Sequence, residues 1–266
     1  MLTLTDIYVY PIKSLGGIRL SEARVEARGL EYDRRWLLID AQGSFLTQRT
    51  WPGLALLDVS LTGQGLTVRH RTRSEIAPLL VPYHSRQSTP IPVRIWDDIC
   101  PALPVSEEAD AWFTQVLGQP TRLVQMPDTT RRPVEPQRVP AGAVVSFADA
   151  YPYLIVGQAS LDHLNDQLPQ PVPMNRFRPN FVFAGGEPHE EDRWSNFWIG
   201  SIPFQAVRPC ARCVVTTIDQ QTAVAGKEPL RTLARYRTWN GKVMFGQNLL
   251  GLGAGTVRVG DELRSV

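Results

Sequence analysis

Short apolar runs separated by glycine or proline fill the first hundred residues, and they constrain the fold more than any other feature of the sequence. The runs are rich in β-branched and aromatic residues, which predicts strands. The expected strands cover residues 4–10, 18–26, 36–39, 55–61, 66–69 and 93–96. Because no helices alternate regularly with them, the pattern favours an antiparallel sheet or barrel over a parallel α/β fold.

One clear helix is expected after these strands. Ser106 is a suitable N-cap, apolar residues recur at helical spacing from 109 to 117, and Gly118 and Pro120 end the helix. A polar, proline-rich stretch at 127–140 then predicts a surface loop or an inter-domain crossing, so we expect two parts, 1–126 and 127–266.

The second part is again expected to be mainly strands. They cover residues 181–184, 197–200, 214–218, 243–245 and 256–259, with short helices at 160–168 and 230–237. The predicted fold class is therefore mainly β with a few helices.

Composition excludes several classes of protein. The formal net charge is +2, which is too small to argue for nucleic acid or an anionic membrane. A nucleic-acid binder using Arg131, Arg132 and Arg138 is a weak alternative, because no aromatic stripe accompanies these residues. The start lacks a secretory pattern and no run is long enough to span a bilayer, so we expect a cytoplasmic chain without membrane contact.

The cysteines are only three, and two of them form a Cys-x-x-Cys pair, Cys210 and Cys213. A zinc site would need two more ligands at a matching spacing, and a redox dithiol would need a helix after the pair, where a strand is expected. Two buried structural cysteines are an equally good interpretation. The remaining interpretation of the pair is a single thiolate bound to a metal inside a cofactor, with Arg212 helping to keep the sulfur ionised.

Several basic residues lie in loops beside the ends of expected strands: Lys13, Arg34, Arg176 and Arg178. Guanidinium, ammonium and hydroxyl groups, such as that of Ser14, suit a phosphate or pterin ligand, although each charge alone is more simply a solvated surface group. Asp149 and Asn248 are either turn residues or ligand contacts.

Taken together, these segments resemble the MOSC-domain proteins, and among them the bacterial YcbX type and the mitochondrial amidoxime reducing component. The match runs in order through nearly the whole chain, and its strongest segment is 208–219, which contains both cysteines of the pair. The other matching segments are 10–14, 33–36, 146–149, 175–180, 245–248 and 255–261.

The resemblance implies a β-barrel-like N-terminal region interlocked with a MOSC domain, with a molybdenum cofactor (Mo-molybdopterin) between them. It implies that Cys213 is the molybdenum ligand and catalytic residue, and that Cys210 and Ala211 form a turn beside the pterin. Its further cofactor contacts are Lys13, Ser14, Arg34, Arg178, Asp149 and the backbone of Ala150 and Tyr151. Arg176 and Asn248 lie in matching segments and complete the candidate set.

The resemblance also implies an activity, the two-electron reduction of the N–O bond of small N-hydroxylated compounds such as amidoximes and hydroxylamines. No cysteine follows Cys213, so the four ligands of a ferredoxin-like iron–sulfur domain are missing. We therefore expect a separate electron donor, a ferredoxin or haem carrier with a flavin reductase. The alternative is a MOSC module that binds, carries or sulfurates the cofactor without reducing a substrate.

Overall fold

The computed structural model describes residues 1–134, 139 and 142–265. Its largest sheet closes into a seven-stranded barrel, because the two ends of the strand series, β12 and β17, also pair with each other. Around the barrel the strands are β12 (Tyr153–Gly157), β13 (Phe181–Ala184), β1 (Leu2–Val9), β19 (Glu262–Ser265), β14 (Asn196–Ile199), β15 (Ile202–Ala211) and β17 (Lys242–Gly251). All neighbours pair antiparallel except β12 and β13. The prediction of a mainly β fold is confirmed.

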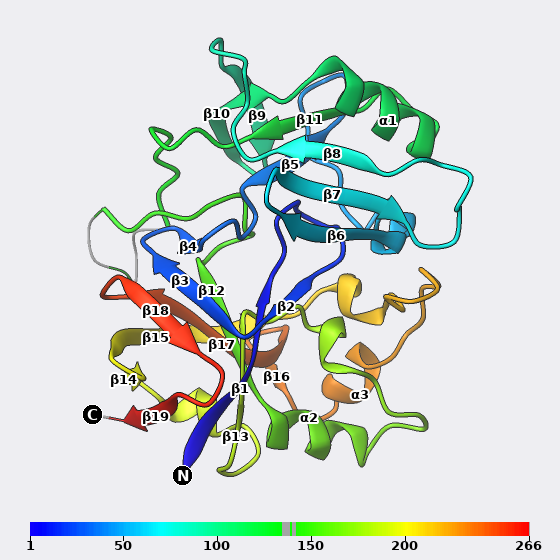
Figure 1. Ribbon diagram of the computed structural model, residues 1–266. Helices are drawn as coiled ribbons and strands as arrows, with labels where there is room; N and C mark the ends of the chain where they lie inside the picture. The colour runs from blue at the N-terminus through cyan, green and yellow to red at the C-terminus, as the bar shows by residue number, and fades with distance from the viewer. Residues whose placement is uncertain (135–138, 140–141, 266) are drawn as a thin grey trace.

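The N-terminal strand β1 belongs to this barrel although the rest of the barrel comes from the second half of the chain. It lies between β13 and β19, with Ile7 opposite Phe181 and Leu2 opposite Leu263. In Figure 1 the blue N-terminal strand crosses the lower half of the molecule among strands from the far end of the chain. The halves are therefore interlocked, as predicted, and strand pairing crosses the boundary placed between residues 126 and 127.

A small sheet strengthens this interlocking. It contains β18 (Gly255–Arg258), β3 (Glu22–Glu26) and β4 (Gly29–Leu30), while β2 (Ile18–Leu20) pairs with β1. Apolar side chains from both halves fill the barrel, and each one fully buried contributes about 1.5–3 kcal/mol. They include Leu4, Ile7, Val9, Phe181, Phe183, Phe204 and Leu249.

The later part of the N-terminal region, from β5 to β11, forms the upper part of Figure 1 and has its own core. One sheet contains β5 (Trp36–Ile39), β11 (Arg122–Gln125), β10 (Asp98–Pro104) and β9 (Ile91–Ile95). A second contains β6 (Leu57–Thr62), β7 (Gly65–His70) and β8 (Leu79–Pro82).

The helix α1 (Glu107–Leu117) has the ends that the sequence predicts. The Ser106 hydroxyl accepts a hydrogen bond from the Ala109 amide at 3.1 Å, and Gly118 has a left-handed φ of 69°. Ala109 and Phe113 are buried, so the apolar stripe faces the core. The two later helices, α2 (Gln158–Asn165) and α3 (Leu230–Leu233), are shorter than expected.

Several strands were not expected from the sequence, and the three that bear most on the fold are β10, β12 and β15. Two of them contain proline, which lacks the amide donor of a sheet ladder and argues against strand in a sequence. In β15 the pairing register with β17 shifts between Ala206 and Arg208 and again between Pro209 and Ala211. Such irregularities redirect side chains, and here they lie in the segment that carries the cysteine pair.

The strand expected at 214–218 is wrong, because η5 (Val214–Thr217) is a single turn of 3-10 helix. The Cys213 carbonyl accepts hydrogen bonds from the amide and the hydroxyl of Thr216, at 3.1 and 3.0 Å. Threonine hydroxyls that bond locally compete with sheet pairing, which outweighs the β-propensity of this run. The short elements that complete the fold are β16 (Thr238–Trp239), η1 (Pro52–Leu56), η3 (Met174–Arg176) and η4 (Glu190–Arg193).

Candidate functional site

A cavity of about 290 Å³ lies where the N-terminal region meets the closed barrel. The N-terminal region contributes the loop after β1, the turn at Arg34 and the segment 47–49. The second half contributes the segment 148–154, residues 177–180, the end of β15 and part of β17. The cavity is therefore built by both halves of the interlocked fold.

Most of the candidate site residues line this cavity. They are Lys13, Ser14, Arg34, Asp149, Ala150, Tyr151, Arg178, Cys210, Ala211, Cys213 and Asn248. The side-chain amide of Asn248 donates to the Arg208 carbonyl at 3.3 Å, which holds it on β17 at the cavity wall. Residues scattered over more than 230 positions of sequence thus meet at one place.

Arg176 is the exception, because it does not line the cavity. Its guanidinium forms an ion pair with Asp219 at 2.7 Å and donates to the Thr216 carbonyl at 3.4 Å. It lies in η3, where the chain directs it toward η5 and away from Arg178, only two residues further on. We therefore remove Arg176 from the candidate cofactor contacts.

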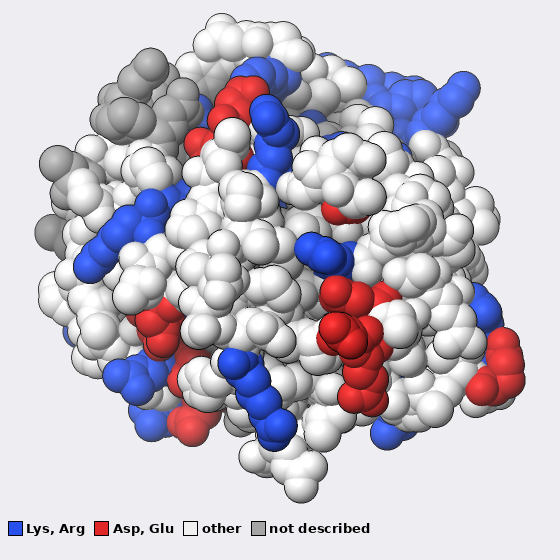
Figure 2. Space-filling model, turned by 90° about the horizontal axis from the view of Figure 1, so that it is seen from above, with Lys and Arg blue, Asp and Glu red and all other residues white. Residues whose placement is uncertain are grey.

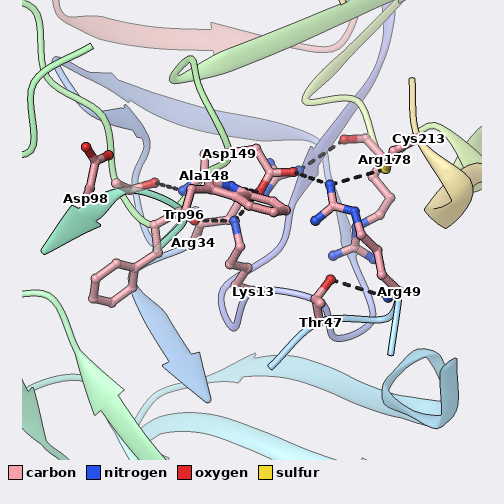
Figure 3. A network of polar contacts seen from close by, with 12 residues as sticks. Lys13, Arg34, Thr47, Arg49, Trp96, Asp98, Ala148, Asp149, Arg178 and Cys213 are labelled. Carbon is pink, nitrogen blue, oxygen red and sulfur yellow. Dashed lines mark hydrogen bonds and ion pairs between the residues drawn. The ribbon is translucent and has the colours of Figure 1, made fainter. Parts of the chain in front are cut away.

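Lys13 and Asp149 form the centre of the polar network in Figure 3. Lys13 is only 7% exposed, and its ammonium donates to Asp149 Oδ1 at 2.5 Å and to the Phe147 carbonyl at 2.6 Å. Burial lowers the pKa of Lys13 to about 8, against the attraction of Asp149. Burial alone would raise the pKa of Asp149, but Lys13 and then Arg49 hold this pKa well below its usual range. The carboxylate is therefore ionised and can only accept hydrogen bonds.

Arg34 and Arg178 contact the same aromatic ring. Each guanidinium carbon lies 4.2 Å from the centre of the Tyr10 ring, and the Tyr10 hydroxyl donates to the Pro179 carbonyl at 3.1 Å. Arg34 also pairs with buried Asp33 at 2.7 Å and donates to the Arg178 carbonyl at 3.1 Å. Burial lowers the pKa of Arg178 to about 10, so the side chain stays charged at neutral pH. Two cations are thus held at one wall of the cavity.

The backbone is strained at three of these residues. Ser14, Arg34 and Arg178 have φ values of 71°, 49° and 53°, in the left-handed region that residues other than glycine rarely adopt. Each such residue costs on the order of 1–3 kcal/mol and persists only when its surroundings impose it. Strain of this kind concentrates at functional sites, which supports a binding role for this wall of the cavity.

Each cysteine of the pair contacts a different arginine. Arg212 Nη1 lies 3.1 Å from Cys210 Sγ, whereas Arg49 Nη2 lies 3.3 Å from Cys213 Sγ. The expectation that Arg212 assists Cys213 is therefore wrong, because the backbone at β15 directs its side chain to the other sulfur. Cys210 belongs to β15, and Cys213 directly precedes η5. Both are free cysteines, so the pair presents two separate thiols.

Arg49 is the site residue that the sequence analysis missed. Its guanidinium lies 4.3 Å from the Trp96 ring and 3.6 Å from Asp149 Oδ2, in addition to its contact with Cys213 (Figure 3). Trp96 in turn donates to Asp149 Oδ1 at 3.3 Å. Arg49 comes from the N-terminal region, far from Cys213 in sequence, and its position after the polar pair Thr47 and Gln48 carries no distinguishing pattern.

The basic residues of the 127–140 stretch do not form one surface. Arg132 is 4% exposed and donates to Asp98 and to the carbonyls of Ser146 and Ala148. It therefore braces the segment that carries Asp149, and it is not available to a partner. Arg131 is exposed, and Arg138 lies outside the described residues. On the face shown in Figure 2, basic and acidic side chains are interspersed.

Comparisons with known proteins identify both halves of the chain. The MOSC N-terminal beta barrel domain matches residues 1–120, and the MOSC domain matches residues 142–264. Mitochondrial amidoxime-reducing component 1 of Homo sapiens is 32% identical over 97% of this chain and 81% of its own length. The Mus musculus protein of the same name is 34% identical over the same shares. Molybdenum cofactor sulfurase of Danio rerio is 30% identical over 92% of this chain and 31% of its own length.

These names contradict the predicted location. The two amidoxime-reducing relatives are named as mitochondrial, so the expectation of a cytoplasmic chain is wrong. That expectation rested on the lack of a secretory pattern, which does not distinguish the two compartments. Within the described parts of the chain, no helix has the length and apolarity that crossing a bilayer requires.

The cavity has the chemistry that a molybdenum cofactor needs. A free thiol, which suits the metal, lies in its wall at Cys213. The cations around it suit an anionic pterin phosphate, and Asp149 is the single carboxylate among the described lining residues. The resemblance inferred from the sequence is confirmed, and the molybdenum cofactor is the cofactor of this group of proteins. With relatives of this identity and coverage, the chain belongs to the MOSC family that includes the mitochondrial amidoxime-reducing components.

Proposed function

We propose that this protein is a molybdenum-cofactor-dependent reductase of small N-hydroxylated compounds. The observation that carries the proposal is the free thiol of Cys213 in the wall of a cation-lined cavity between the two interlocked halves. The amidoxime-reducing relatives, which span nearly the whole chain, support the choice of substrate. When bound, the cofactor supplies the two-electron redox chemistry, and the protein supplies position and charge.

The residues of the cavity take separate roles in this proposal. Cys213 is the metal ligand, and Arg49 holds its sulfur from the N-terminal side. Lys13, Arg34 and Arg178, with the hydroxyl of Ser14, bind the anionic part of the cofactor, since charged donors make the strongest hydrogen bonds. The pterin contacts are Asp149, Ala150, Tyr151, Cys210, Ala211 and Asn248.

A separate electron donor is part of the proposal. The sequence holds neither a dinucleotide-binding glycine motif after a strand nor the cysteines of an iron–sulfur cluster. We therefore expect a flavin reductase with a ferredoxin or haem carrier to supply electrons. The contact with such a carrier is expected to be small and transient, as electron-transfer encounters usually are.

Reduction of benzamidoxime tests this function directly. With protein made in a host that supplies molybdopterin, we expect turnover when reduced viologen dye is the donor. We expect none with NADH or NADPH alone, because a nicotinamide delivers a hydride that must first be split into single electrons. Benzamidine formation, followed by chromatography, is the measurement.

The same assay decides between reductase and carrier. The molybdenum cofactor sulfurase relative covers most of this chain, which favours a module that holds or transfers cofactor as the second candidate. A protein that retains molybdenum but gives no benzamidine with the dye would support the carrier. Robust turnover with NADH alone would instead contradict the proposed need for a donor protein.

The burial of Lys13 predicts that rising pH weakens cofactor retention but stabilises the protein that holds no cofactor. Its pKa of about 8 in the fold lies below the ordinary value of 10.5, so the ammonium charge is lost as pH rises through about 8. Cofactor retention should therefore fall, by at most about tenfold per pH unit, between about pH 8 and pH 10. Molybdenum retained after gel filtration at each pH measures this.

In the protein without cofactor, the free energy of unfolding changes with pH in the opposite direction to cofactor retention. Between about pH 8 and pH 10.5 the unfolded lysine binds more protons than the folded one, so this residue makes the free energy of unfolding rise with pH. Lys13→Arg keeps its charge throughout and should flatten both profiles. A Lys13→Arg variant with the wild-type pH dependence of retention would show that another group titrates.

A further inference from the structure

The chain reaches the surface directly after the cysteine pair. Val214, the residue that follows Cys213, is 51% exposed, although Cys213 lines the cavity. The chain then passes through η5 into a loop whose Gly226 amide donates to the Thr217 carbonyl at 3.0 Å, so this loop packs against η5. Val224, in the same loop, is also exposed. Exposed apolar surface therefore begins one residue away from the proposed metal ligand.

The hairpin formed by β16 and the start of β17 is hydrogen-bonded to the cysteine segment. The Arg212 amide donates to the Val243 carbonyl at 2.7 Å. The Asn-Gly turn at 240–241 has φ values of 49° and 71°, as the two-residue turns that favour hairpins require. This turn places Trp239 directly opposite Lys242, so both side chains project from the same face of the hairpin. Since Lys242 lines the cavity and Trp239 is 57% exposed, an exposed indole lies beside the rim of the cavity.

Basic side chains accompany these apolar residues. The segment 211–244 contains six basic and two acidic residues, a net charge of +4, whereas the whole chain carries +2. Both acidic residues are bound by arginines, Asp219 by Arg176 at 2.7 Å and Glu228 by Arg231 at 2.6 Å. Helix α3 contacts η5 and leads into the hairpin, so the segment forms one continuous part of the surface. Its other exposed basic residues are Lys227, Arg235 and Lys242.

We propose that these exposed residues form the docking surface for an acidic one-electron carrier protein, such as a ferredoxin. The inference rests on the proposed function, which requires a separate electron carrier. Reducing one N–O bond consumes two electrons and two protons and releases water, so a one-electron carrier must bind and leave twice in each turnover. A small apolar centre accompanied by basic charges suits such a brief contact, because it combines a modest area with fast electrostatic association. The surface consists of Val214, Val224, Trp239, Lys227, Arg235 and Lys242.

Binding of an acidic ferredoxin to the intact chain, measured by biolayer interferometry, tests this surface without turnover. At an ionic strength of about 0.1 M, Arg235→Glu should weaken binding at least about fivefold, because repulsion replaces attraction. This loss should shrink at about 1 M salt, where the screening length is only about 3 Å. Trp239→Ala removes an apolar contact and should weaken binding at least about tenfold, with little dependence on salt.

Arg24→Glu is the matched control. It makes the same charge change at an exposed arginine of β3, which lies at the left of Figure 1, whereas α3 lies at the lower right. At about 0.1 M salt this variant should bind within about twofold of wild type, because charges more than about 10 Å apart are largely screened. Melting temperatures show whether each variant is folded, and Lys227→Glu replaces Arg235→Glu if the latter is not.

The proposal is overturned if wild type does not bind the ferredoxin, or if neither Arg235→Glu nor Trp239→Ala weakens binding. An equal loss in Arg24→Glu and Arg235→Glu would also overturn it, since it would indicate attraction by net charge alone. Benzamidoxime reduction by the same variants should fall with ferredoxin as donor and stay at the wild-type rate with the viologen dye. If the dye gives no turnover in wild type, the proposed reductase function fails, whereas the binding measurements still decide whether this surface holds a carrier.

Discussion

Cys213→Ser is expected to abolish benzamidoxime reduction, whereas Cys210→Ser keeps most of the activity. Serine is a harder and far less acidic donor than cysteine, so it cannot replace a thiolate ligand to molybdenum. The two sulfurs have separate surroundings, with Arg49 at Cys213 and Arg212 at Cys210. Both line the cavity and both are partly buried, so the variants are closely matched. Dye-driven turnover at equal protein concentration is the measurement.

Molybdenum and pterin contents, measured on the same preparations, separate loss of the metal ligand from loss of the fold. We expect Cys213→Ser to melt at the wild-type temperature when both proteins are free of cofactor. Complete inactivation of both variants to the same extent would contradict a single-thiol site and indicate that the two sulfurs act together.

Arg178→Ala and Arg34→Ala are expected to lose most of their bound cofactor, while Arg176→Ala keeps it. A charge-assisted contact contributes about 1.5–3 kcal/mol, so each of the first two changes should weaken binding about 10- to 150-fold. Arg176 is a matched control of the same residue type, two positions away, whose guanidinium pairs with Asp219 outside the cavity. Pterin content after purification, normalised to protein, is the measurement.

The double variant, Arg34→Ala with Arg178→Ala, tests whether the two arginines act together. Arg34 and Arg178 both contact the Tyr10 ring, and Arg34 donates to the Arg178 carbonyl, so the effects of the two substitutions should not add. Arg176→Ala is expected to lower the melting temperature, because it removes a contact to η5, without lowering pterin content. Full pterin content in both Arg34→Ala and Arg178→Ala would show that the anionic group binds elsewhere.

Local signals in the sequence determined a large part of the fold. Ser106 and Gly118 marked the ends of α1 because capping depends on a few neighbouring residues, and short runs of β-branched and aromatic residues marked β5, β7 and β13. The same reasoning missed β15, which contains two prolines, and it failed at η5, where two threonine hydroxyls bond to the local backbone.

The candidate site was only partly determined by the sequence. The order of the motifs brought Lys13, Arg34, Asp149 and Cys213 into one set, and all of them line the cavity. The residue types alone did not separate Arg176 from Arg178, because both are arginines in the same loop, and only the resemblance favoured Arg178. One pairs with Asp219 and the other faces Tyr10, and this difference depends on which way the backbone turns.

Only the tertiary structure decided which arginine contacts which sulfur. It also showed that Arg132 is buried and donates to backbone carbonyls. Arg49 and Cys213 are 164 positions apart and belong to different halves of the chain. They meet because β1 is paired inside the barrel of the second half, which draws the N-terminal region over the end of β15. Side-chain partners across such an interface depend on long-range strand pairing, whereas caps and strand periodicity depend on residues a few positions apart.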